Sequence, residues 1–269
     1  MPDTSKDLPL SGHLEELRKI VGRCVIVWIL AALLCFACKD MLFRIIFAPA
    51  QSDFLVFQAL QYLSSLWHIP SLSPGEFTPH FIATELTAQF MTHITVSLVA
   101  SAVLCTPFII YELFQFVAPA LRQTNRRLSA LVIVLSSLLF IMGITLNYFV
   151  IFPFAYRFLS SYQVQPDIVN QITISSYISL FVVLSLLMGL LFELPVIAYI
   201  LAKLGLVTGE QMRHYRKYAL VAILLLSAII TPTADAITLL LVTLPVYALY
   251  LFSIAVAKRV TINRQRVES

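Results

Sequence analysis

A single carboxylate, Glu193, stands inside the apolar run LLMGLLFELPVIAYIL, residues 186–201, two positions before Pro195. A charged carboxylate at the centre of a bilayer costs about 2.5–3.5 kcal/mol on insertion scales, so an acid in such a run is a functional candidate. Pro195 removes a backbone donor and loosens the helix beside the acid. The pattern predicts a polar group facing a water-filled concavity. The alternative is an acid near the membrane interface, wetted where the bilayer thins.

A second group of charges lies in SGHLEELRKIVGR, residues 11–23. Glu15 and Lys19 have the i,i+4 spacing of a helical ion pair, worth a few tenths of a kcal/mol. That is the structural explanation of these charges. The functional one is that Glu15 and Glu16 are adjacent acids on an otherwise basic face, which would attract a basic partner. Helical neighbours point about 100° apart, so only one of these acids can face that partner squarely.

Two further stretches carry charge between apolar runs. In APALRQTNRRL, Pro119 ends one apolar run, and the pair Arg126 and Arg127 opens the next. The structural explanation of this pair is that its positive charge fixes the orientation of the helix in the membrane. In TPTAD, Asp235 either caps the following helix or forms part of a site.

Metal and enzyme chemistry are not indicated. Cys35 and Cys38 have CxxC spacing, but no second Cys/His pair completes a zinc set, and we interpret all four cysteines as packing residues. The histidines have no metal-ligand spacing, and no HExxH, GxSxG or glycine-rich phosphate loop occurs. We expect no metal, no cofactor and no catalytic activity.

The composition indicates a membrane protein. Of 269 residues, 59% are hydrophobic and 12% charged, against about a quarter charged in soluble domains. The net charge of +4 does not indicate nucleic acid, because Lys and Arg fall between the apolar runs. A spanning helix needs about 20 mostly apolar residues. We therefore predict a single all-α transmembrane domain over residues 1–269 with six spans at about 20–38, 88–112, 128–152, 174–200, 216–231 and 236–257.

The charge distribution predicts the orientation. With these spans, fifteen Lys and Arg lie on the side of the termini and three, Lys39, Arg44 and Arg157, on the other. Positive charge marks the cytoplasmic side, so both termini are predicted to be cytoplasmic. The outer connection 39–87 is too apolar for a free loop and is expected to form short helices. The last two spans form a tight hairpin, and the fifth is short.

Several motifs, in this order and topology, resemble the TatC family, the integral membrane subunit of the twin-arginine protein translocase. They are HLEELRK, APA at 48–50, TPFIIYELFQFVAPAL with RRL, SSLLFIMGITLNYFVIFPFA, FELPV, and TPTAD followed by LPVYALY. The resemblance covers most of the chain. It implies a concave, glove-like bundle with short fifth and sixth helices.

The resemblance also implies site residues. Glu16 matches the signature glutamate of the N-terminal region, Arg18 the adjacent basic residue, and Glu193 the fourth-span glutamate. Asp235 matches the acid of the last outer turn, and Pro49 the proline of the first outer loop. Pro119 and Pro195 belong to the second-span and fourth-span motifs.

The chain departs from the family pattern at Asn125, where the family usually has a glutamate before its Arg-Arg pair. Charge-assisted hydrogen bonds are roughly twice as strong as neutral ones, so Asn125 weakens this contact with a basic ligand. Either Glu15 supplies the second acid or the signal is bound more weakly or with altered preference.

The implied function is that of signal-peptide receptor and core subunit of the twin-arginine translocase, which exports folded proteins across the bacterial cytoplasmic membrane using the proton-motive force. The implied partners are twin-arginine signal peptides, single-span TatA/TatB-type subunits, further copies in a receptor complex, and lipid. The alternative is a proton-coupled transporter of small solutes, which would also place a carboxylate in the membrane.

Overall fold

The computed structural model describes residues 10–67, 80–117, 126–165, 167, 170–230 and 236–268. Nearly all of them are helical, as the all-α prediction requires. The elements, in chain order, are α1 (Leu10–Ala37), α2 (Lys39–Phe47), the 3-10 turn η1 (Ala48–Ala50), α3 (Leu55–Trp67), β1 (Phe81–Ile82), α4 (Ala88–Val117), α5 (Arg126–Leu146), the π-helical segment η4 (Asn147–Ile151), α6 (Phe152–Ser161), β2 (Ile172–Thr173), α7 (Ile174–Phe192), α8 (Leu194–Leu204), α9 (Gly209–His214), α10 (Arg216–Ile230) and α11 (Ala236–Glu268).

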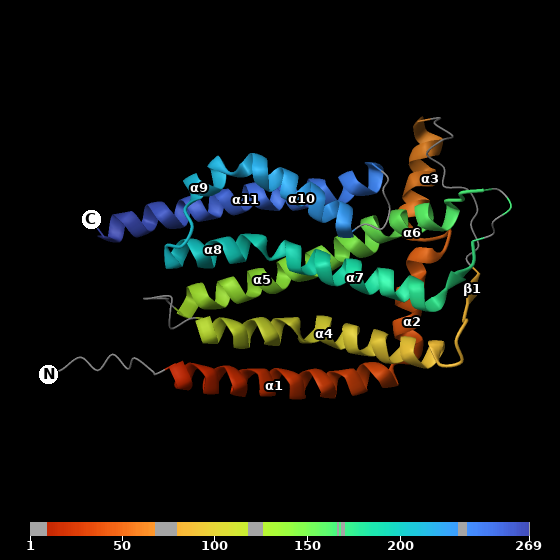
Figure 1. Cartoon of the computed structure of the whole chain (residues 1–269), viewed down its shortest axis with the longest axis horizontal. Coiled ribbons are helices and arrows are strands. Elements are labelled where there is room, and N and C mark those ends of the chain that lie inside the picture. The colour runs from red at the N-terminus through yellow and green to blue at the C-terminus, as the bar shows by residue number, and fades with distance from the viewer. Residues whose placement is uncertain are drawn as a thin grey trace.

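The long helices lie side by side (Figure 1). In that view α1 packs on α4, α4 on α5, α5 on α7, and α8 and α10 on α11. The start of α1, helix α9 and the C-terminal part of α11 lie at one end of the bundle, and α2, α3 and α6 lie at the other. The first and last helices thus present their terminal turns on the same side.

Five helical segments of the described chain are long and apolar enough to cross a membrane. They are Leu14–Ala37, Ala88–Val117, Ser129–Ser161, Ile174–Leu204 and Thr238–Asn263. They overlap the first four predicted spans and the sixth. The predicted fifth span falls on α10, whose 15 residues extend about 22 Å. The hydrocarbon core is about 30 Å thick, so the prediction of a short fifth helix is confirmed.

The prediction of a short sixth helix is wrong. Helix α11 has 33 residues and continues past the predicted end at residue 257. Helix α11 packs on α8 and α9 ahead of this polar extension. Ala257 is fully buried there, and the Tyr250 hydroxyl donates a 2.8 Å hydrogen bond to the carbonyl of Met212 in α9.

The prolines in or near the predicted spans fall into two groups. Helices α4 and α11 continue through Pro107 and Pro245. By contrast, Pro153 follows the π-helical segment at the start of α6, and Pro195 follows the junction at Glu193 where α7 gives way to α8. A proline is tolerated in the first turn of a helix, where its missing N–H is not needed. The predicted third and fourth spans are therefore each built of two helical parts.

The connection 39–87 contains helices α2 and α3, as predicted. Pro49 is buried in η1. The core of this end is aromatic: Phe152 and Tyr177 are edge-to-face with ring centroids 5.1 Å apart. The Tyr177 hydroxyl donates a 2.7 Å hydrogen bond to the carbonyl of Ile46 in α2. Beside it, β1 and β2 form a parallel ladder that pairs Phe81 with Ile172.

Candidate functional site

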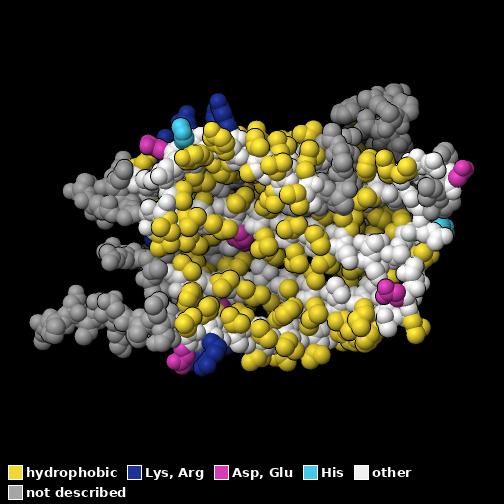
Figure 2. Space-filling model, in the orientation of Figure 1, with side chains coloured by type: hydrophobic (Ala, Val, Ile, Leu, Met, Phe, Trp, Pro, Cys, Tyr) yellow, Lys and Arg dark blue, Asp and Glu magenta, His cyan; other side chains and the backbone are white. Residues whose placement is uncertain are grey.

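The surface of the bundle is apolar. Figure 2 shows hydrophobic side chains over most of the visible face, with Lys and Arg gathered toward one end. Large side chains on the long helices are widely exposed, among them Leu34 at 71% and Leu104 at 68%. Apolar surface of this extent is unfavourable in water and suits contact with lipid.

Glu193 is held by the neighbouring helix. It occupies the junction between α7 and α8, where its backbone N–H donates to the carbonyls of Leu190 and Leu191. The Ser136 hydroxyl of α5 donates a 2.5 Å hydrogen bond to Glu193 Oε2. Ser136 is buried, and Glu193 Oε1 is buried with no hydrogen-bond partner among the described residues. The carboxylate therefore keeps one acceptor oxygen unused.

The two acids of α1 differ in their surroundings. Glu15 forms an exposed ion pair with Lys19, Oε1 to Nζ 2.9 Å. Glu16 is exposed, and no hydrogen bond or ion pair engages it within the described chain. Ile20, four residues further on, is buried against the bundle, so Glu16 lies on the flank nearest α4. Arg18 is about 200° from Glu16 around the helix and faces away from it.

An acid that sequence reasoning missed lies opposite α1. Glu112 in α4 is 4% exposed, and its Oε2 accepts a 2.7 Å hydrogen bond from Arg23 Nη2 of α1. The same two helices are joined where Trp28 Nε1 donates a 2.9 Å hydrogen bond to the carbonyl of Leu98. Glu112 stands in the apolar run YELFQF, the same signal that singled out Glu193.

For five other predicted residues the structure gives little or no information. Asn125, Pro119 and Asp235 lie outside the described residues. Arg126 and Arg127 are the first two residues of α5, and their side chains also lie outside the described part. The loop contacts predicted for them therefore stay predictions.

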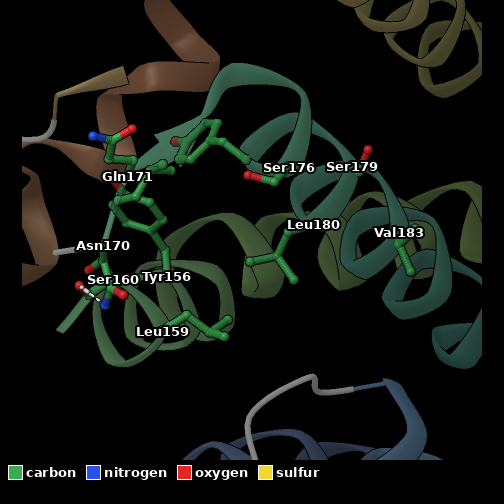
Figure 3. Close-up of a pocket in the computed structure, with 11 residues that line it drawn as sticks. Tyr156, Leu159, Ser160, Asn170, Gln171, Ser176, Ser179, Leu180 and Val183 are labelled. Atoms are coloured by element: carbon green, nitrogen blue, oxygen red, sulfur yellow. Dashed lines mark hydrogen bonds between the residues drawn. The ribbon is translucent and has the colours of Figure 1, made fainter. Parts of the chain in front are cut away.

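Among the cavities of the described bundle, two have largely apolar walls. One, of about 580 Å³, has an apolar wall built from α1, α2, α4, α5 and α7, with Leu34, Val103 and Phe181 among its lining residues. The other, of about 600 Å³, lies between α6 and α7 (Figure 3), at the end of the bundle that holds α2 and α3, where the Asn170 amide donates to the carbonyls of Ser160 and Tyr162. Neither cavity is lined by Glu16 or Glu193. Neither of these two acids therefore lies in either of the two cavities.

The cysteines are free thiols, with Cys35 buried and Cys38 exposed. Within the described chain, no group of three or more His, Cys, Asp or Glu side chains is arranged to hold a metal ion.

The fold and these sites define a multi-pass helical membrane protein with acidic side chains set among basic ones at one end. The family model of the Sec-independent protein translocase protein TatC matches residues 12–245. The chain is 30% identical to TatC of Blattabacterium sp. over 96% of this chain and 97% of that one. It is 32% identical to TatC of Escherichia coli K12 over 90% and 85% of the two chains.

Among solved structures, the crystal structure of the twin-arginine translocase receptor TatC in DDM superposes with a TM-score of 0.72 at 27% identity, covering 91% of this chain and 99% of that one. The chain belongs to the TatC family and is a membrane subunit of a Sec-independent protein translocase.

Proposed function

We propose that this subunit is the signal-peptide receptor and core of a twin-arginine translocase, exporting folded proteins across the bacterial cytoplasmic membrane with the proton-motive force. The observation that carries the proposal is the exposed Glu16 carboxylate, which no described side chain engages. The same end of the bundle carries exposed cations on α9, α10 and α11, namely Arg213, Arg216, Lys217, Lys258 and Arg259. A dibasic peptide is repelled by those cations and attracted at Glu16.

The topology of the proposal has six spans, with α10 as the short fifth, and both termini in the cytoplasm. The Lys and Arg bias supports it, since α9 and the end of α11 carry basic residues on the side where α1 begins. In this arrangement Arg126 and Arg127 flank the bound signal, together with Arg18 and Asn125. Asp235 lies on the outer side.

Glu193 has a different proposed role. Its unused acceptor oxygen, Oε1, can receive a hydrogen bond from a helix that docks in the membrane, whether the apolar part of a signal peptide or a single-span TatA/TatB-type subunit. The partners proposed are these subunits, dibasic signal peptides, lipid and further copies of the chain.

Export of an Arg-Arg reporter protein by cells that carry Glu16→Ala or Glu193→Ala tests the proposal. We expect export to fall strongly in both variants, with the subunit still present in the membrane at the wild-type level. Glu15→Ala is compared with Glu16→Ala: because Glu15 is engaged by Lys19, we expect a smaller loss of export, and an equal loss would make Glu15 a second acid of the site. Full export by Glu16→Ala would contradict the receptor assignment.

The half-buried Glu193 also suits a proton-coupled transporter of small solutes. The two functions differ in liposomes containing this subunit alone: a transporter accumulates solute there, whereas a receptor binds dibasic peptides and transports nothing.

A further inference from the structure

The ion pair between Arg23 and Glu112 is unequal in its exposure. The Glu112 side chain is 6% exposed, while that of Arg23 is 56% exposed. Glu112 is fixed within α4, whereas the guanidinium of Arg23 comes in from the flank of α1. One partner is therefore buried in the bundle and the other can withdraw.

Glu112 needs a cation at all times. Removing one partner of a buried pair leaves an uncompensated charge, which is strongly unfavourable. Arg23 can therefore leave at low cost only if a second cation takes its place. The structure already shows which chemical group fits, because Glu112 accepts a guanidinium N–H at 2.7 Å.

Glu16 and Arg23 lie on one flank of α1. They are seven residues apart, which is nearly two full turns of the helix and about 10 Å along its axis. A peptide that runs along this flank from the end of the bundle meets the open carboxylate of Glu16 and then the occupied carboxylate of Glu112. The spacing thus presents two acids in line to a ligand with two guanidinium groups.

We propose that Glu112 is the second carboxylate of the receptor site, and that Arg23 occupies it until an arginine of the incoming peptide displaces it. This inference rests on the proposed receptor function. Arg23 is then an intramolecular competitor that lowers the affinity for every ligand. Selectivity comes from Glu112 itself, because the planar guanidinium of arginine matches a buried carboxylate better than the compact, strongly hydrated ammonium of lysine.

The test measures binding of two fluorescent synthetic peptides to the full chain in lipid nanodiscs. One peptide has an Arg-Arg pair before an apolar stretch, and the other has Lys-Lys at the same positions. Arg23→Ala frees Glu112, so we expect it to bind the Arg-Arg peptide about tenfold more tightly, since a tethered competitor acts at high effective concentration. Arg213→Ala, which removes one exposed cation from the same end, is the control and is expected to change the affinity less than twofold.

A charge-swapped variant, Arg23→Glu with Glu112→Arg, separates this role from a purely structural one. It keeps an ion pair between α1 and α4, and its unfolding temperature shows whether the fold is retained. We expect at least a tenfold loss of affinity, because the buried acid is gone.

Wild-type affinity in the folded swap, or no gain in Arg23→Ala, would overturn the inference and leave a pair that only joins two helices. Glu16→Gln separates the two proposals: unchanged binding there would contradict the receptor function itself, whatever the variants at Glu112 show.

Discussion

The Ser136 hydroxyl of α5 and the carboxylate of Glu193, 57 positions apart in sequence, are joined by a hydrogen bond of 2.5 Å. The bond occurs where α7 gives way to α8, so an interruption of the fourth predicted span faces the third. An acid placed in an apolar segment is thus partly satisfied by a neighbouring helix, and only its second oxygen stays without a partner among the described residues.

Substitutions at this pair should separate the bond to Ser136 from the acceptor role proposed for Oε1. Glu193→Gln keeps an oxygen that accepts from Ser136 but puts an NH2 donor in place of Oε1, so we expect the fold to be retained and export of an Arg-Arg reporter to fall. Glu193→Leu leaves the buried Ser136 hydroxyl without this acceptor, and we expect export to be lost and the fold to be destabilised by about 1–3 kcal/mol. Unchanged export by Glu193→Gln would contradict the proposal that Oε1 accepts a hydrogen bond from a docking helix.

The crossing of α5 and α7 depends on Gly143. A Cβ atom there would lie 2.5 Å from the carbonyl oxygen of Met188 and 2.9 Å from Phe192 Cγ. We expect Gly143→Ala to destabilise the protein by about 1–3 kcal/mol, because two backbones must move apart. Thermal unfolding in detergent checks this, with Gly22→Ala as the control, since a Cβ at Gly22 meets nothing within 4 Å. The same loss in both variants would show that helix crossing is not its cause.

A buried amide lies at the start of the π-helical segment. Asn147 is fully buried, and its Nδ2 donates a 2.9 Å hydrogen bond to Ser185 Oγ in α7. Ser185→Ala removes that acceptor, and we expect a loss of about 1–3 kcal/mol in unfolding free energy. Replacing both partners by apolar residues, Asn147→Leu with Ser185→Ala, should recover most of it. A double variant less stable than Ser185→Ala would contradict this account of the pair.

The proposed orientation can be read from the native thiols. Cys38 follows α1 directly and is exposed, while Cys35 and Cys105 are buried. If the N-terminus is cytoplasmic, Cys38 lies on the outer side. A membrane-impermeant maleimide added to spheroplasts should then label the wild-type chain, and Cys38→Ser should abolish the labelling. Labelling of Cys38 only in inverted vesicles would reverse the assigned orientation.

Much of the fold was predictable because hydrophobicity acts locally. Runs of apolar residues long enough for a bilayer located the helices, and the short α10 could be recognised from its length alone. The end of α11 could not, because its last turns are polar and lack the hydrophobicity by which a membrane span is recognised.

The charged sites also have a part that the sequence predicts and a part that it does not. An acid inside an apolar run is visible in the sequence, and that rule identified Glu193 and would equally have identified Glu112. Which side chain binds each acid was decided by the tertiary structure alone. Ser136 and Arg23 are 57 and 89 positions away from their partners, and helix packing brings each pair within hydrogen-bond distance. The sequence determines where a charge must be compensated, because the free energy of moving a charged side chain out of water depends on the type of that residue. Packing determines what compensates it, because that depends on which helices become neighbours.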